Sequence, residues 1–263
     1  LYSWNPQSEG AKQLALSLGV KRLKEKGSLF KGGSSKTIVN WGRSSFEGNP
    51  EALKCRIINH PDRVALASDK LGFYRLLDGK FDPDLLVPWT TDLSKALEWL
   101  KSSDDIVFAR TKLRASGGDG IVVMTKDDPD TFVKAPLYTK YVKKSDEYRI
   151  HVAGGNIFLM QRKGLRQTDD VGNPIDPNKV DWKIRNLANG FIFARDNINP
   201  PEVVTNAAVA VSEHMGLDFY AADIIYNQKS DRAYVLEVNT APGLNGSTVG
   251  DYATAINGLI SQT

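Results

Sequence analysis

The sequence predicts an α+β fold, a mixture of helices and antiparallel sheets, because helix and strand patterns occur together without strict alternation. Residues 219–226 and 233–239 are two apolar segments of strand length joined by a short polar connection, which is typical of a hairpin. Residues 201–215 place apolar side chains on one helical face, and Gly216 can end that helix. We expect these elements to close the core.

The other elements are expected in order along the chain. They are a helix at 8–20, a strand at 37–42, helices around 66–79 and 94–103, strands at 106–110 and 120–124, and strands on both sides of a Gly-Gly-Asn turn at 154–156. This order predicts a small α/β lobe at residues 1–65, a second lobe at 66–140 and a third at 141–263.

Composition excludes several classes of protein. The chain has 263 residues, of which 41% are hydrophobic and 25% charged, as in ordinary globular proteins. A net charge of +3 does not by itself indicate nucleic-acid binding. With Cys55 alone and three histidines, neither an intrachain disulfide nor a zinc site is expected. No apolar run is long enough for a bilayer and the start lacks a signal-peptide pattern, so a cytoplasmic location is expected.

Polar side chains interrupt the last apolar strand. Within residues 234–244, Glu237 and Asn239 share a strand face two residues apart, and Asp223 lies on the preceding strand. Buried carboxylates are costly unless a partner compensates for their lost hydration. A set of oxygen ligands favours Mg²⁺ or Mn²⁺ over zinc, and a structural carboxylate network is the alternative.

The hairpin register decides whether these groups meet. If Asn227 pairs with Ala233, Asp223 lies opposite the glutamate of the next strand. The same register places Val235 on the carboxylate face and Leu236 on the opposite face.

A glycine-rich loop follows the strand at 106–110. It combines Arg110, Lys112 and Arg114 with a Ser-Gly-Gly-Asp-Gly turn, in which backbone N–H groups can approach phosphate oxygens. The loop lacks the P-loop pattern and leads into a strand instead of a helix. A plain hairpin turn explains the glycines equally well.

Taken together, these segments resemble the ATP-grasp superfamily over residues 66–245. Residues 218–244 are similar to its pattern of an Asp strand, a Leu-Glu-Val-Asn strand and a Pro-Gly turn. The resemblance implies two α+β lobes that clamp ATP, preceded by a small α/β lobe, with Asp223, Glu237 and Asn239 as Mg²⁺ ligands. Residues 182–190 resemble the glutamate-ligase branch, and the compact layout is similar to ATP-grasp proteins of tailed phages.

The same resemblance implies roles for further residues. Those that would hold the nucleotide are Lys70, Arg110 (where the family usually has lysine), Ser116, Gly117, Gly118, Lys140, Tyr141, Val142 and, at the ribose, Glu147. Those that would face the reacting groups are Arg149, Arg162, Arg185 and Asn186, with Lys183 as a competitor of Arg185.

Structural alternatives exist for several of these residues. Arg149 could be a cation on a sheet surface, Lys70 an ordinary first-turn helix residue, and Glu147 a partner of Lys143 or Lys144. His151, like the other two histidines, is expected to be structural or solvent-facing.

The activity implied by the resemblance is an ATP-dependent carboxylate–amine ligase that acts through an acylphosphate and releases ADP and phosphate. Its partners would be a carboxylate and an amine acceptor, either a small molecule, a peptide, a protein or a modified nucleic acid, without a membrane partner. A kinase-like phosphotransferase and a non-catalytic nucleotide-binding module are the main alternatives. A nucleic-acid-binding protein, indicated only by the basic run at 21–26, is the third.

Overall fold

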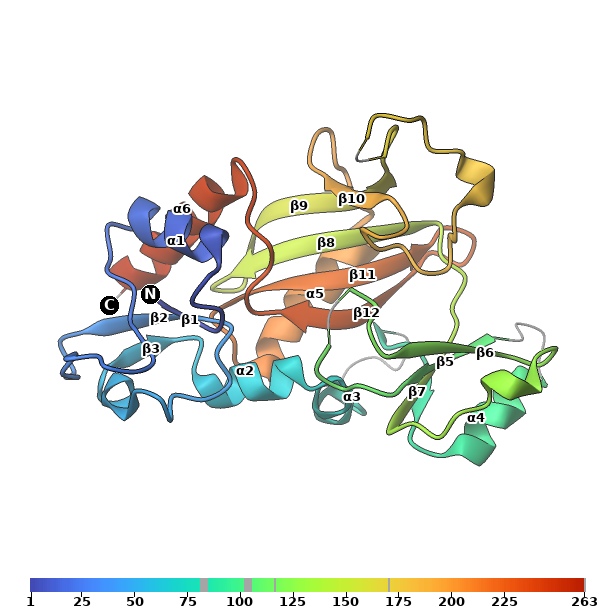
Figure 1. The fold of residues 1–263 in the computed structure, drawn as a ribbon, viewed down its shortest axis with the longest axis horizontal. Helices are drawn as coiled ribbons and strands as arrows, with labels where there is room; N and C mark the ends of the chain where they lie inside the picture. The colour runs from blue at the N-terminus through green and yellow to red at the C-terminus, as the bar shows by residue number, and fades with distance from the viewer. Residues whose placement is uncertain (81–84, 102–105, 116, 170, 263) are drawn as a thin grey trace.

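The computed structural model describes residues 1–80, 85–101, 106–115, 117–169 and 171–262. In this part of the chain the strands form three sheets (Figure 1). The three-stranded sheet lies at one end of the molecule, the five-stranded sheet in the middle and the four-stranded sheet at the other end. We use the term first lobe for the three-stranded sheet and the segments around it in residues 1–58. The α+β class predicted from the sequence is confirmed.

The first sheet is parallel and consists of β1 (Tyr2–Ser3), β2 (Thr37–Trp41) and β3 (Arg56–Ile58). Helices α1 (Glu9–Ser17) and α6 (Thr248–Ser261) lie side by side beside it, so segments from both ends of the sequence meet here (Figure 1). The side chains buried between these elements include Leu14, Trp41, Tyr252 and Ile256.

The second sheet is antiparallel, in the order β4 (Trp89–Thr90), β7 (Leu137–Lys140), β5 (Ile106–Arg110) and β6 (Ile121–Thr125). Helix α4 (Leu93–Leu100) covers one face of this sheet. The apolar side chains between the helix and the sheet include Ala96, Leu100, Val107, Ala109 and Met124.

The third sheet is also antiparallel. Its order is β10 (Phe191–Ala194), β9 (Asn156–Leu165), β8 (Asp146–Ala153), β11 (Phe219–Asn227) and β12 (Arg232–Asn239). Strand β11 is buried along almost its whole length, as expected for a strand with neighbours on both sides and cover on both faces.

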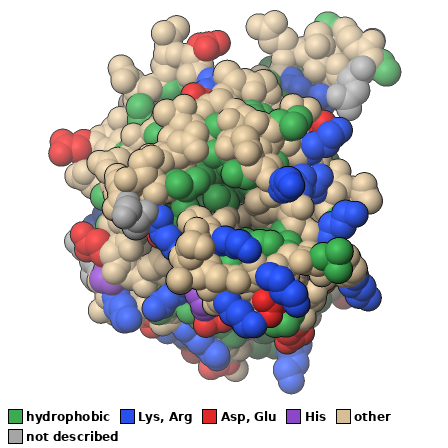
Figure 2. Space-filling model, turned by 90° about the vertical axis from the view of Figure 1, so that its left-hand side faces the viewer, with side chains coloured by type: hydrophobic (Ala, Val, Ile, Leu, Met, Phe, Trp, Pro, Cys, Tyr) green, Lys and Arg blue, Asp and Glu red, His purple; other side chains and the backbone are tan. Residues whose placement is uncertain are grey.

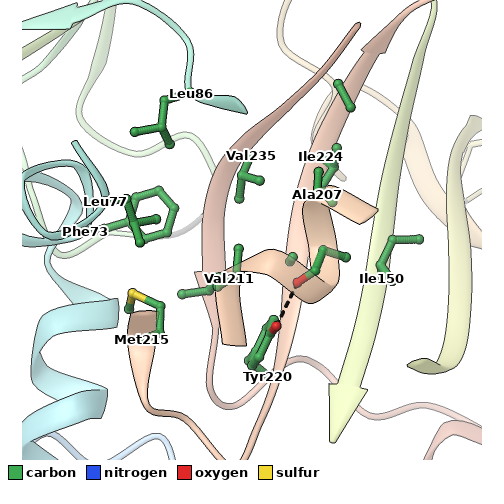
Figure 3. Close-up of a cluster of buried hydrophobic side chains, with 14 of the residues drawn as sticks. Phe73, Leu77, Leu86, Ile150, Ala207, Val211, Met215, Tyr220, Ile224 and Val235 are labelled. Atoms are coloured by element: carbon green, nitrogen blue, oxygen red, sulfur yellow. Dashed lines mark hydrogen bonds between the residues drawn. The ribbon is translucent and has the colours of Figure 1, made fainter. Parts of the chain in front are cut away.

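One face of the third sheet is packed against helices. Helix α5 (Glu202–Met215) crosses it, and α2 (Pro61–Ser68) and α3 (Lys70–Leu77) complete the layer. Figure 3 shows this core, in which apolar side chains from the helices meet those of β8, β11 and β12. The labelled members include Phe73, Leu77, Ile150, Val211, Tyr220 and Val235.

The helix expected around residues 66–79 is wrong in its bounds. Helix α2 ends at Ser68, and a separate helix begins at Lys70. The carboxylate of Asp69 accepts a hydrogen bond from the backbone N–H of Gly72 at 3.0 Å. An aspartate that caps a helix adopts an extended backbone, so it interrupts the preceding helix and fixes the start of the next one.

Short 3₁₀ helices lie at Pro50–Lys54, Pro129–Thr131 and Pro177–Lys179. Among the described residues, no helix combines the length and apolarity needed to cross a membrane. Figure 2 shows the first-lobe end of the molecule, where lysine and arginine side chains gather over the lower and right-hand parts of the surface.

A buried asparagine links the first lobe to the third sheet. Asn59 is fully buried, with a left-handed backbone (φ 63°) that asparagine tolerates well. Its amide donates to the carbonyl of Phe219 at 2.8 Å and accepts from the backbone N–H groups of Asp218 at 2.8 Å and Phe219 at 3.1 Å. The Asn59 N–H also donates to the Asp218 carboxylate at 2.6 Å. This amide therefore fixes β3 against the start of β11.

We expect Asn59→Ala to lower the free energy of unfolding by about 3 kcal/mol, because buried backbone groups of β11 lose their partners. Urea unfolding followed by circular dichroism measures the change. Asn206→Ala, on the exposed face of α5, is the matched control and should change stability by less than about 0.7 kcal/mol. A loss below about 1 kcal/mol in Asn59→Ala would contradict the role of this side chain.

Candidate active site

A cleft of about 510 Å³ opens between the four-stranded and five-stranded sheets. Strands β5 to β12, the start of α3 and several loops contribute residues to its lining. The predicted residues that line it are Lys70, Arg110, Gly117, Gly118, Lys140, Tyr141, Val142, Glu147, Arg149, Arg185, Asn186, Asp223 and Glu237. Residues that are far apart in the sequence thus meet in one cleft.

Three further predicted residues are not among those that line the cleft. Ser116 lies outside the described residues. Asn239 lines a neighbouring cavity instead of this cleft, and Arg162 lines neither of them.

The hairpin of β11 and β12 brings the two carboxylates together. Asp223 pairs with Glu237, as predicted. At the turn, however, Asn227 pairs with Arg232 and not with Ala233, so the assumed register is wrong there by one residue. A β-bulge beside Asp223 restores the expected pairing, because it places two residues of one strand opposite one residue of the other.

The bulge also corrects the predicted faces of β12. Val235 pairs with Ile224 and packs into the helical core, whereas Leu236 lines the cleft. Both positions are the reverse of the prediction. Regular alternation fails at a bulge, since the extra residue shifts every side chain beyond it to the other face.

Arg149 of β8 holds the carboxylate of Asp223. Its Nε donates to Oδ1 at 2.6 Å and its Nη2 to Oδ2 at 2.8 Å, a two-pronged pair in which the carboxylate is almost fully buried. Burial opposes ionisation of Asp223, but the charge and hydrogen bonds of Arg149 outweigh it and lower the pKa of the carboxyl. Burial likewise opposes the charge of Arg149, and Asp223 raises the pKa of the guanidinium.

Lys70 holds the second carboxylate. Its Nζ lies 3.0 Å from Oε2 of Glu237 and donates to the carbonyl of Ala115, in the glycine-rich loop, at 2.7 Å. Both carboxylates therefore have a cation as partner. These two basic side chains compensate for the lost hydration of the carboxylates, so their burial by itself does not require a metal.

The donor set nevertheless fits a hard divalent cation. Asp223 and Glu237 are cross-strand neighbours, and the Asn239 amide lies 3.4 Å from Oδ2 of Asp223. These are the oxygen-bearing groups that Mg²⁺ prefers. In the described part of the chain no three His, Cys, Asp or Glu side chains cluster as a metal site, so phosphate or water oxygens would have to complete a coordination shell.

Glu147 is buried and lies between two lysines. Lys144 Nζ is 2.7 Å from its Oε2, and Lys163 forms a short ion pair with its Oε1. The alternative in which Glu147 pairs with Lys144 is confirmed as a contact. Burial lowers the pKa of Lys144, and the charge of Glu147 opposes that shift.

Arg162 is not brought to the cleft. It pairs across the sheet with Tyr148, and its guanidinium is more than half exposed and bound to Asp146 at 2.5 Å. Its neighbour Lys163 lines the cleft instead and lies over the ring of Phe193. The period of two along β9 could have revealed this, because Gln161, opposite Arg149, shares its face with Lys163.

The loop before β10 reaches the glycine-rich loop. The Asn186 amide donates to the carbonyl of Gly117 at 2.9 Å, and Arg185 donates to the carbonyl of Ser145 at 3.2 Å. A Cβ at Gly118 would lie 3.3 Å from the Asn186 nitrogen, so these two loops touch. Lys183 and Arg185 both line the cleft, and the choice between them stays open.

Two arginines that line the cleft each have a buried side-chain nitrogen without a hydrogen-bond partner among the described residues. Nε of Arg110 and Nε of Arg185 are buried and make no hydrogen bond within the described residues. Charged donors without partners are costly, and an anion in the cleft would satisfy them.

The opposite end of the cleft is apolar. The rings of Phe108 and Tyr141 meet edge to face with their centres 5.8 Å apart. Ile225 and Leu236 line the cleft from the facing sheet. A planar aromatic group would be held between these two walls.

A second cavity of about 870 Å³ adjoins the cleft. It lies between the first lobe, represented by Trp4 and Ser44, and the loop that follows β12. Lys70, Arg149 and Glu237 line both spaces, so they form a shared wall.

Comparison with known proteins gives a match in structure but not in sequence. No protein-family model matches the chain, and no curated protein resembles it in sequence. A structure of the ATP-grasp ligase PsnB complexed with a minimal precursor matches with a TM-score of 0.67 at 15% identity, over 100% of this chain and 98% of that one.

Other solved structures agree. The D-cycloserine synthetase DcsG matches with a TM-score of 0.62 at 14% identity, over 95% of this chain and 94% of that one. The macrocyclase MdnC from Microcystis aeruginosa MRC, bound with precursor peptide MdnA, matches with a TM-score of 0.61 at 13% identity, over 100% and 98%. The chain therefore has the fold of the ATP-grasp ligases.

Proposed function

We propose that this protein is an ATP-dependent carboxylate–amine ligase. The observation that carries the proposal is the wall where Asp223 and Glu237 meet Lys70 and Arg149, between a cleft with an apolar end and a second cavity. This arrangement suits a reaction between a nucleotide on one side and an organic substrate on the other.

ATP would enter the cleft with its base along Lys140, Tyr141 and Val142, between the wall of Phe108 and Tyr141 and the facing wall of Ile225 and Leu236. Its phosphates would lie toward Lys70 and the glycines of the loop. Nε of Arg110 supports this orientation, because this charged donor has no hydrogen-bond partner among the residues that the structure describes. Glu147, at the polar part of the wall, would accept from the ribose hydroxyls.

Mg²⁺ would be held by Asp223, Glu237 and Asn239. Solved structures of PsnB contain Mg and ADP, which supports the same cofactors here. When bound, the cation would neutralise charge on the phosphates and orient them for transfer. Binding would separate each carboxylate, at least in part, from its present basic partner.

In the proposed reaction a carboxylate oxygen of the substrate attacks the γ-phosphorus, and the bond to the leaving ADP breaks. The amine then attacks the carbonyl carbon of the acylphosphate, phosphate leaves, and the amine loses a proton. Arg149 and Arg185 would stabilise the negative charge of these states. Lys163, not Arg162, would supply the basic group of β9, since it lines the cleft.

The second cavity would receive the carboxylate and the amine. Precursor peptides in the PsnB and MdnC structures support a peptide substrate, whereas the DcsG match is equally consistent with small molecules. The three lobes at 1–65, 66–140 and 141–263, the cytoplasmic location and the phage origin stay predictions.

The proposal is tested by the products that ATP turnover gives. With Mg·ATP and a panel of amino acids, polyamines and peptides, we expect ADP and free phosphate in equal amounts only when both a carboxylate and an amine are present. Coupled assays for ADP and phosphate measure both. A phosphorylated product without phosphate release would identify a phosphotransferase instead, and nucleotide binding without turnover would identify a binding module.

A second prediction concerns the ion pair of Lys70. In Glu237→Gln the lysine is free to meet phosphate, so the affinity for AMP-PNP without metal should rise roughly fivefold, or about 1 kcal/mol. The gain in affinity on adding Mg²⁺ should fall at least about tenfold, because a ligand is lost. Calorimetric titrations with EDTA and with Mg²⁺ measure both quantities.

Glu213→Gln, the same change at an exposed position of α5, is the matched control and should alter neither quantity. If Glu237→Gln bound metal-free nucleotide no better than the original protein, Lys70 would not be the group that the glutamate restrains. An unchanged Mg²⁺ dependence would remove the metal assignment.

A further inference from the structure

Three side chains behind the cleft form a buried hydrogen-bonded row. Tyr252 Oη of α6 lies 2.7 Å from Nδ1 of His151 on β8, and His151 Nε2 lies 2.9 Å from Oε1 of Gln161 on β9. All three are at least nine-tenths buried, and Gln161 lines the cleft. The row thus runs from the helix beside the first lobe to the wall of the cleft.

The direction of the hydrogen bonds follows from the donors available. The oxygen of the glutamine amide can only accept, so Nε2 of His151 carries a hydrogen and donates to Gln161. Burial lowers the pKa of His151 to about 4, so at neutral pH Nδ1 has no hydrogen and must accept. Burial also raises the pKa of Tyr252, whose hydroxyl therefore remains protonated and donates to Nδ1. Every polar atom of Tyr252 and His151 is then satisfied.

This row leaves the Gln161 amide nitrogen as a donor. Its oxygen is held by His151, and the nitrogen makes no hydrogen bond to the rest of the described chain. Gln161 pairs across the sheet with Arg149 and is two residues from Lys163, which lines the same cleft. An amide donor beside two cations suits an anionic oxygen.

Resting on the proposed function, we propose that Gln161 donates its amide N–H to the transferred phosphoryl group, and that His151 and Tyr252 are positioning residues that fix the orientation of this amide. A purely structural role for the row is the competing explanation. The two explanations predict different affinities for nucleotides with and without a γ-phosphoryl group.

The test compares the affinities for AMP-PNP and ADP in the presence of Mg²⁺. In Gln161→Leu we expect AMP-PNP to bind about tenfold more weakly while the affinity for ADP stays within about twofold, because ADP lacks the group that the amide meets. A purely structural role would change both affinities together or neither.

Matched conservative substitutions test the positioning residues. Tyr252→Phe removes only the hydroxyl and should weaken AMP-PNP selectively by about threefold. Tyr220→Phe is its matched control: this tyrosine is equally buried, and its hydroxyl donates to the carbonyl of Ala208 at 2.7 Å in the core, away from the cleft (Figure 3). Tyr220→Phe should lower the free energy of unfolding by a similar amount and leave the ratio of the AMP-PNP and ADP affinities unchanged.

His151→Gln keeps an amide donor near the place of Nε2 and should retain most of the selectivity, whereas His151→Leu should lose it. If His151→Leu does not fold, Gln161→Leu and Tyr252→Phe still decide the matter. If the original protein binds nucleotide but Gln161→Leu leaves the ratio of the AMP-PNP and ADP affinities unchanged, the inference is overturned and the proposed site is upheld. Failure of the original protein to bind either nucleotide would instead refute the proposed function.

Discussion

The pairing of Asp223 with Glu237 across the β11–β12 hairpin is the constraint on which the rest of the site depends. A β-bulge produces it, and the bulge also turns Leu236 toward the cleft and Val235 toward the helical core. A regular hairpin would give a different set of neighbours, since a shift of one residue exchanges the faces of a strand. The geometry of the site is thus set by one irregularity in the middle sheet.

The two carboxylates at the shared wall are each paired with a basic side chain without any ligand. Asp223 is held by Arg149 and Glu237 by Lys70, so each acidic group that could bind a cation is paired with a basic group that could bind phosphate. Removing one partner of a buried pair typically costs about 3–5 kcal/mol, so the pair of Arg149 with Asp223 holds β8 and β11 in register. A ligand that brings both a cation and phosphates can replace both partners at once, whereas either alone leaves a charge uncompensated. This physical reason links the two halves of the proposed nucleotide site.

The arrangement of the lobes puts this wall between two cavities. Asn59 fixes the first sheet to β11, and α6 returns from the end of the sequence to pack beside α1. The second cavity lies between the first lobe and the loop that follows β12. Tyr252 and His151 extend the same packing to the back of the cleft.

The sequence by itself determined the α+β class and the closing hairpin, because periodicity and turn chemistry are local properties. It also predicted that Asp223 meets Glu237, but from a register that is one residue off at the turn, and the bulge restores this pairing. Most of the residues that the sequence indicated through a resemblance to ATP-grasp proteins line the cleft. Only the tertiary structure decided that Leu236 faces the cleft and that Arg149 and Lys70 compensate the carboxylates. These outcomes depend on a bulge and on ion pairs between segments distant in sequence. Periodicity cannot encode them, since the partner of a side chain is fixed only when the sheets and helices pack.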